Sequence, residues 1–160
     1  MLRMTEDQML GAPMADEEFL DWYVEEFMRG ELADFYVSNG PAVCRTFTAN
    51  GRLYAQHFGI ARPDLQAQFV TLMWVLAPNF WEDPGFVAIL EDPTLDESAK
   101  IEAVHAVPDA VAERAMANAD SEAWYPELRE DNIIGVPYVG ISDEEVDDLL
   151  AEIRAERAAR

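Results

Sequence analysis

The sequence has a single cysteine and no long apolar run, and both shortages limit what the protein can be. Cys44 alone cannot form an intramolecular disulfide, which suits a reducing compartment. No apolar run approaches the roughly 20 residues that a membrane-spanning helix needs. Residues 1–19 lack the apolar middle section of a secretory signal peptide. We therefore expect a cytoplasmic protein.

Basic residues are also few, because 11 lysines and arginines face 32 acidic residues, for a formal net charge of −21. Such a chain is repelled by nucleic-acid backbones and anionic membranes and attracted to basic proteins, although the charge also serves solubility. The charge is uneven: residues 31–80 hold three acids and three arginines, and residues 81–140 hold fourteen acids and three bases. We predict a basic protein partner and neither a nucleic-acid nor a membrane partner.

The motifs of catalytic and metal sites are missing. The chain has no Gly-rich phosphate loop, nucleophile elbow, HExxH or CxxC. Cys44 and His57 are a conceivable thiol–base pair, but no signature surrounds the cysteine, and a buried thiol with a histidine at a helix end is the simpler interpretation. The acidic run at residues 143–148 lacks the central glycine of a calcium loop. We predict no enzyme, no catalytic residue, no cofactor and no metal.

Apolar residues make up half of the chain, which is enough for the core of one domain. Their helical spacing predicts a mainly α fold. We expect a single compact helical domain over residues 1–160, with about five or six helices and a long aperiodic acidic loop before the C-terminal helix. Residues 1–14 are expected to be flexible. No feature of the sequence indicates a homo-oligomer.

The expected helices follow from periodicity and from their start and stop signals. Residues 15–38 form the first, which Gly30 ends or bends. A second follows Pro41 and is interrupted near Asn50-Gly51, with a short strand at residues 43–48 as an alternative. A buried helix near residues 62–77 stops at Pro78, and its core stripe is expected to be Leu65, Phe69, Leu72, Met73 and Leu76. A short helix is expected at residues 84–92. One or two helices follow a proline turn within residues 91–119, capped by Asp96 or Thr94 and kinked or divided by Pro108. A last helix is opened by the capping box Ser142-x-x-Glu145.

The aromatic side chains outside these apolar stripes are the candidate contacts to a partner. Trp81 stands beside Glu82 and Asp83 and is expected to be the most exposed aromatic residue of its segment. Aromatics also fill the acidic stretch at residues 120–140, where they either anchor a partner or tie a long loop to the core. The candidate partner-binding residues are Trp81, Trp124, Tyr125, Glu127, Glu130, Asp131, Tyr138, Asp143, Glu144, Asp147 and Asp148.

One part of the chain resembles a known family. The residues that carry the likeness are His57-Phe58-Gly59-Ile60, Phe69 with Leu72 and Met73, Asn79-Phe80 with Asp83-Pro84, and residues 90–95. This pattern of a buried helix, an Asn-Phe-x-x-Asp-Pro corner and a short helix is similar to small bacterial proteins of type VI secretion effector clusters. Phe58 replaces the usual tyrosine, and the likeness covers roughly a third of the chain.

The resemblance implies an accessory protein that binds a secreted effector. Such proteins act as immunity proteins, which neutralise a toxin, or as adaptors and chaperones, which help to load an effector without inhibiting it. The resemblance does not choose between these roles. The acidic composition leaves a third interpretation, a nucleic-acid mimic that blocks a DNA-binding enzyme, although the acids cluster in blocks rather than at regular spacing.

Overall fold

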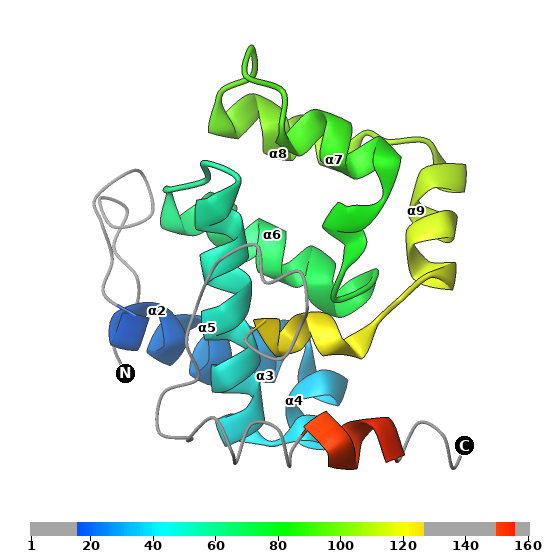
Figure 1. The fold of residues 1–160 in the computed structure, drawn as a ribbon. Helices are drawn as coiled ribbons and strands as arrows, with labels where there is room; N and C mark the ends of the chain where they lie inside the picture. Colours follow the sequence, from blue (N-terminus) through cyan, green and yellow to red (C-terminus); the bar gives the residue numbers. More distant parts are fainter. Residues whose placement is uncertain (1–15, 127–149, 156–160) are drawn as a thin grey trace.

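A computed structural model describes residues 16–126 and 150–155, and these residues are mainly helical, with no strand among them (Figure 1). The elements are α2 (Asp16–Trp22), the π-helix η1 (Tyr23–Met28), α3 (Arg29–Glu31), α4 (Ala33–Asn39), α5 (Pro41–His57), α6 (Pro63–Val75), the 3-10 helix η2 (Phe80–Glu82), α7 (Pro84–Leu90), α8 (Glu97–His105), α9 (Asp109–Ala117) and the 3-10 helix η3 (Ser121–Trp124). The helical class is confirmed. The expected flexible N-terminus, the acidic loop beyond Pro126 and the capping box at Ser142 lie outside the described residues.

The first predicted helix is broken into several pieces. Its π-helical turn continues from α2, and the chain leaves helical geometry at Leu32, where φ is −128° and ψ is 43°. The break was expected at Gly30, which instead lies inside α3. The predicted apolar stripe is confirmed at its start, because Phe19 and Tyr23 are completely buried.

Helices α5 and α6 pack against each other at the centre of the fold (Figure 1). A Cβ atom at Gly51 would lie 3.0 Å from Val70 and 3.1 Å from the sulfur of Met73, so the glycine allows the two helices to approach closely. The strand alternative for residues 43–48 and the interruption expected near Asn50-Gly51 are both wrong, because α5 runs without a break from Pro41 to His57. Phe69 of α6 is completely buried, as predicted.

The second half of the described chain forms three short helices: α8 packs against α6 and α7, and α9 packs against η2. Asp83 caps α7 by accepting a hydrogen bond from the backbone N–H of Gly85, at 2.8 Å, and Asp96 caps α8 in the same way through Ala99. Pro108 separates α8 from α9, as predicted. In Figure 1, α7 and α8 lie together at one end of the molecule and α9 lies to their side.

None of the helices in the described ranges is long and apolar enough to cross a membrane.

Candidate partner-binding site

The structure places Trp81 in the core, so the prediction that it is exposed is wrong. Its side chain is 4% exposed, and its ring centroid lies 4.7 Å from that of Tyr54 and 6.1 Å from that of Phe58. The turn η2 directs Trp81 inward against α5, while the neighbouring Glu82 is exposed. The acidic residues next to Trp81 in the sequence suggested that Trp81 would be exposed. In a tight turn, however, the side chains of neighbouring residues point in different directions.

Trp124 and Tyr125 tie η3 to the core, as the alternative role for these aromatics predicts. Trp124 is 5% exposed and stacks on Phe47 with 4.8 Å between ring centroids. Tyr125 meets Phe47 edge-on at 5.1 Å. Asn50 donates a 2.7 Å hydrogen bond to the carbonyl of Trp124. The other candidates beyond Pro126 lie outside the described residues: Glu127, Glu130, Asp131, Tyr138, Asp143, Glu144, Asp147 and Asp148.

The same aromatic residues line an open groove of about 430 Å³, which we call the aromatic groove. Its walls come from α4, α5, α6, the turn after α6, and η3. The lining residues are Phe35, Asn39, Phe47, Met73, Trp74, Leu76, Ala77, Pro78, Ser121, Trp124 and Tyr125. Its volume lies within the range of roughly 300–1,000 Å³ that is typical of ligand pockets. The groove therefore offers a concave apolar surface that several helices hold in place.

Trp74 is the central ring of the aromatic groove. Its centroid lies 5.4 Å from that of Phe35 and 4.5 Å from that of Trp124. The indole N–H is buried and has no hydrogen-bond acceptor among the described residues. Most buried polar groups in proteins are hydrogen-bonded, so this donor marks the groove as a place where the fold has not satisfied its own polar atoms.

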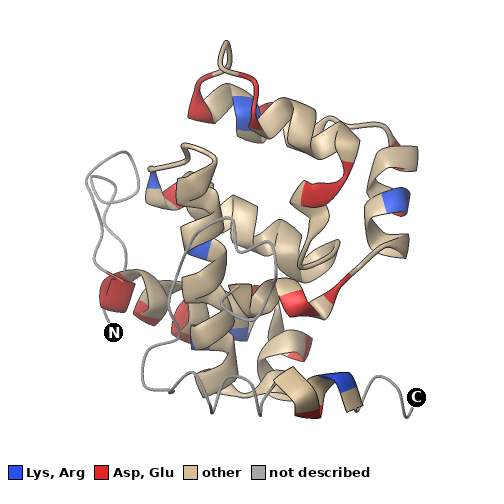
Figure 2. Cartoon of the chain, viewed as in Figure 1, with Lys and Arg blue, Asp and Glu red and all other residues tan. Residues whose placement is uncertain are grey.

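The described residues that line the aromatic groove carry no charged side chain, although acidic residues adjoin some of them in the sequence. Asp34 directly precedes the lining residue Phe35, and Asp120 and Glu122 flank Ser121. Figure 2 shows acidic residues near η3, on α2 and between α7 and α8. A groove without cationic residues in its described lining, in a chain whose net charge is −21, is suited to a basic partner.

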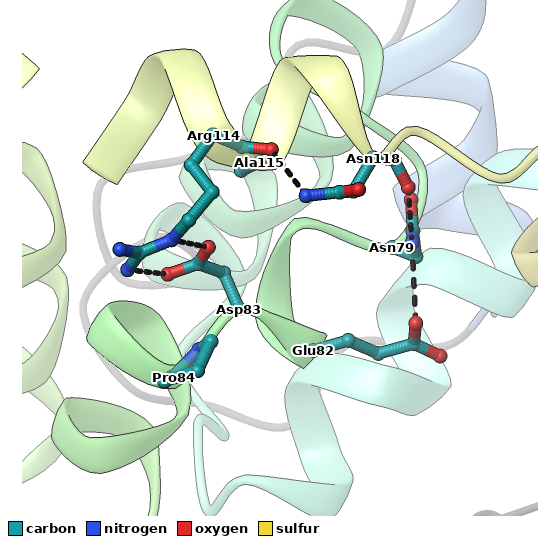
Figure 3. Close-up of a pocket in the computed structure, with 7 residues that line it drawn as sticks. All are labelled: Asn79, Glu82, Asp83, Pro84, Arg114, Ala115 and Asn118. Atoms are coloured by element: carbon teal, nitrogen blue, oxygen red, sulfur yellow. Dashed lines mark hydrogen bonds and ion pairs between the residues drawn. The ribbon is translucent and has the colours of Figure 1, made fainter. Parts of the chain in front are cut away.

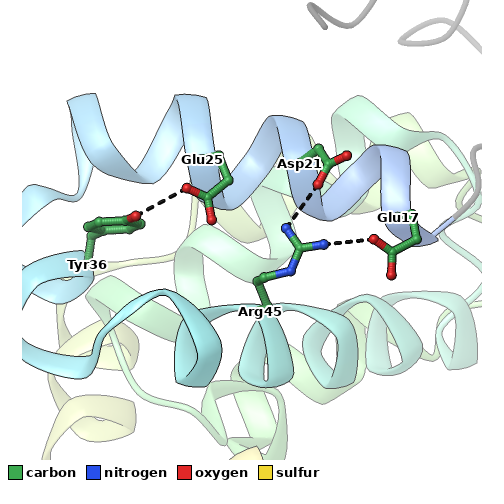
Figure 4. A network of polar contacts seen from close by, with 5 residues as sticks. All are labelled: Glu17, Asp21, Glu25, Tyr36 and Arg45. Atoms are coloured by element: carbon green, nitrogen blue, oxygen red, sulfur yellow. Dashed lines mark hydrogen bonds and ion pairs between the residues drawn. The ribbon is translucent and has the colours of Figure 1, made fainter. Parts of the chain in front are cut away.

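The arginines of the first half are occupied by internal contacts. Arg45 of α5 donates to Glu17 at 2.9 Å and to Asp21 at 3.0 Å, which ties α2 to α5 (Figure 4). The buried Arg52 donates to Asp16 at 2.8 Å, and its guanidinium lies 4.6 Å from the centre of the Phe19 ring. Because these two guanidinium groups are bound to carboxylates of the same chain, they are less accessible to a partner. The net charge of the chain remains strongly negative.

A second hollow, the corner pocket, has a volume of about 370 Å³ and contains several hydrogen-bonded polar side chains (Figure 3). Its lining residues are Asn79, Glu82, Asp83, Pro84, Arg114, Ala115 and Asn118. Asp83 accepts two hydrogen bonds from Arg114 of α9, at 2.6 and 2.8 Å. These bonds lower the pKa of Asp83, even though its burial acts in the opposite direction. The side chain of Asp83 is 5% exposed, so the charge pair is half-sheltered from water.

Asn79 forms the other side of the corner pocket. Its amide nitrogen donates to Glu82 and to the carbonyl of Asn118, both at 3.1 Å, and its oxygen accepts from the backbone N–H of Asp120 at 2.7 Å. Asn79 and Asp83 are two of the residues that carry the family resemblance. Their contacts hold η2, α7 and α9 together, so these motif residues have a structural role.

Cys44 and His57 do not form a thiol–base pair. Both belong to α5 and are separated by about 20 Å along its axis, given a rise of about 1.5 Å per residue. Burial raises the pKa of the Cys44 thiol, which faces the carbonyl of Phe35 at 3.8 Å. His57 is exposed at the end of the helix. Within residues 16–126 and 150–155, no group of histidine, cysteine and carboxylate side chains could hold a metal ion.

Sequence reasoning named Trp124 and Tyr125 but missed the rest of the aromatic groove. Phe35 and Leu76 belong to different helical segments, and nothing in their local pattern connects them. One feature of the sequence could have indicated the groove: Trp74 is a large aromatic residue that lies outside the predicted core stripe of α6. No family model, curated protein or solved structure matches the chain.

Proposed function

We propose that this protein is a non-catalytic accessory that binds a basic protein partner. The observation that carries the proposal is the aromatic groove, which has no basic residue among the described residues that line it, in a chain with a net charge of −21. Apolar anchors surrounded by charge are the usual anatomy of a protein interface. The net charge of −21 adds long-range attraction toward a basic surface and so raises the association rate.

The resemblance of residues 57–60 and 68–104 to accessory proteins of type VI secretion clusters supplies the kind of partner. We propose a secreted effector, and an immunity role in which binding covers the active site of a toxin. A toxin that cuts nucleic acid fits the charge, since a site for phosphate backbones is basic. The acidic residues at positions 143–148 extend the attraction to such a surface.

The experiment is a pull-down from native cell extract with the tagged full-length protein at low and high salt, followed by mass identification. We expect one basic protein to be retained, and to be retained less at high salt because screening weakens charge attraction. The purified protein is then added to the retained partner. Loss of the partner's toxic activity supports immunity, whereas a complex that keeps its activity supports an adaptor or chaperone.

Two controls make the result specific. Excess DNA or heparin in the extract tests for a nucleic-acid mimic, which would release its enzyme to these polyanions. A bait in which Asp143, Glu144, Asp147 and Asp148 are changed to lysine tests for charge attraction, and we expect it to associate more slowly at low salt. If nothing is retained at either salt, the protein is not a binder of a basic partner and the proposal is wrong.

A further inference from the structure

Helix α9 is attached to the fold through little apolar surface. Ala115 is its one buried residue, Val111 is half-buried, and Met116 is 51% exposed. The central helix α6, by contrast, buries most of its side chains, among them Phe69 completely. Burial of apolar surface is the main force that holds an element to a domain, and elements with little of it open at a lower free energy than the core. We therefore expect α9 to open more easily than α6.

The corner pocket lies between α9 and the turn on which α9 packs (Figure 3). Its lining residues come from α9 and its C-terminal cap on one side and from residues 79–84 on the other. Atoms that face a hollow have fewer packing partners, so a pocket of about 370 Å³ at this contact removes part of the dispersion attraction. The apolar contact between α9 and η2 is therefore incomplete.

Polar contacts at two places hold α9 against this turn. Arg114 donates two hydrogen bonds to Asp83, at 2.6 and 2.8 Å. The side chain of Asn79 bonds to the carbonyl of Asn118 and to the backbone N–H of Asp120. The Arg114 side chain is 51% exposed. Water can bond to these groups once they separate, so the net stabilisation from each bond is modest. Contacts of this kind close α9 onto the turn but permit it to open.

One close apolar contact joins α9 to the start of α7. A Cβ atom on Gly85 would lie 2.6 Å from Cγ1 of Val111. This distance is shorter than two carbon atoms in contact can adopt, so a side chain at position 85 would push Val111, and α9 with it, away from α7. The glycine therefore allows α9 to close, and its replacement loosens α9 without changing any charge.

We propose that α9 is a strap that opens as one unit from η2 while α5 and α6 stay folded, and that the pair of Asp83 and Arg114 holds it closed. Pro108 separates the strap from α8. At the other end, η3 stays anchored because Trp124 stacks on Phe47. The strap is therefore a short helix between two fixed points.

Opening of the strap changes what the corner pocket offers to a ligand. In the closed form, Asp83 is bonded to Arg114, and Asn79 is bonded to the chain that follows α9. In the open form, the carboxylate of Asp83 loses both bonds from Arg114 and becomes an acceptor for a group outside the fold. The strap therefore controls access to the polar side chains of the corner, whether or not the aromatic groove binds a partner.

Hydrogen exchange of the full-length protein, followed residue by residue by NMR, tests the strap. We expect the hydrogen-bonded amides of α9 to exchange at one common rate, at least about tenfold faster than those of α6, because local opening needs less free energy than global unfolding. Low concentrations of urea should accelerate exchange strongly in α6 and weakly in α9, since opening one short helix exposes little surface. Equal rates and equal urea dependence in the two helices would overturn the strap. So would rates that fall from the ends of α9 to its middle, which indicate fraying.

Three substitutions test what holds the strap closed. Arg114→Met removes the charge pair, and we expect exchange in α9 to accelerate at least about tenfold, which corresponds to the loss of a charged hydrogen bond. Gly85→Ala should also accelerate it, by displacing Val111. The control, Glu113→Gln, alters an exposed neighbour on the same helix and should change the rate by less than about threefold. If Arg114→Met and Glu113→Gln behave alike, the charge pair does not hold the strap and the proposal is wrong in that part.

A substitution in the core separates opening of the strap from unfolding of the whole protein. Val70 of α6 is completely buried and faces Gly51 of α5. We expect Val70→Ala to accelerate exchange in α6 at least about tenfold, as is typical of a truncated core side chain, and to leave α9 unchanged, because the contacts of Val70 persist when the strap opens. Acceleration of α9 by the same factor would mean that α9 exchanges only when the whole protein unfolds, and there would be no strap.

Discussion

The aromatic groove and the corner pocket are similar in size but differ in how their polar atoms are satisfied. In the corner pocket, Asn79 makes three hydrogen bonds, and Asp83 is bound by Arg114 and by the backbone of Gly85. In the aromatic groove, the Trp74 donor has no acceptor among the described residues. A pocket whose polar groups are already hydrogen-bonded within the fold has few donors or acceptors left to bind a ligand.

This difference separates structural residues from candidate binding residues. The corner pocket joins η2, α7 and α9, and its hydrogen bonds are used within the fold. The aromatic groove is lined mainly by aromatic and aliphatic residues, and none of its described lining residues is basic. Substitutions in the corner pocket should therefore lower stability, and substitutions at the edge of the groove should change binding.

The largest loss of stability is expected when a side chain of the core is truncated. Phe69 is completely buried and packs 5.0 Å from Phe80, measured between ring centroids. We expect Phe69→Ala to lower the free energy of unfolding by about 3–5 kcal/mol, as is typical of a truncated buried phenylalanine. Urea unfolding measures the change. The control is Val75→Ala on the same helix, which is 44% exposed and should change stability by less than about 0.5 kcal/mol.

A smaller loss is expected at the charge pair of the corner pocket. Asp83→Ala removes the cap of α7 and both hydrogen bonds from Arg114. We expect the free energy of unfolding to fall by about 2–4 kcal/mol, from a lost N-cap and lost charged hydrogen bonds. The control, Glu113→Ala, removes an exposed carboxylate beside Arg114 and should be nearly neutral. Equal losses for the two variants would contradict a structural role for Asp83.

The hydrogen bonds of Asn79 give a more moderate prediction. Asn79→Ala leaves the backbone N–H of Asp120 without its acceptor, and we expect a loss of about 1–3 kcal/mol. The matched control is Asn118→Ala, because the exposed Asn118 side chain bonds only within its own helix end, to the carbonyl of Arg114. Urea unfolding of both variants compares them. A larger loss at Asn118 would show that Asn79 does not hold the corner together.

The smallest expected effect is a change with pH in the stability that the charge of Asp83 contributes. Hydrogen bonds from Arg114 hold the pKa of Asp83 below its ordinary value of 3.8 in the folded protein. The stability that this carboxylate contributes is therefore present above that pH and is lost as the pH falls through the lowered pKa. Asp83→Asn keeps a good capping residue but removes the charge. We expect the stability difference between the natural protein and Asp83→Asn to narrow below a pH of about 4.

Unfolding curves of both proteins at a series of acidic pH values measure this narrowing. A difference that stays constant through the acidic range would mean that the charge of Asp83 does not contribute to its role in the corner pocket.

The features that the sequence determined by itself are local ones. Helical periodicity predicted α6, the short helices that follow, and α5 apart from an interruption that does not occur. Of the two expected caps, Asp96 and Thr94, the structure has Asp96, and Pro108 divides two helices as expected. Phe69 was correctly assigned to the core. These outcomes depend on backbone geometry and on the spacing of apolar residues within one helix, so neighbouring residues contain the information.

Only the tertiary structure decided which aromatic residues are buried and which meet in a hollow. Trp81 is buried because η2 turns it against Tyr54 of α5, although its neighbours in the sequence are acidic. Trp124 lies on Phe47 and Trp74, which are distant from it in the chain. Helices that are apolar on several sides can pack through any of them, so the position of the aromatic groove depends on how the helices assemble rather than on any one segment.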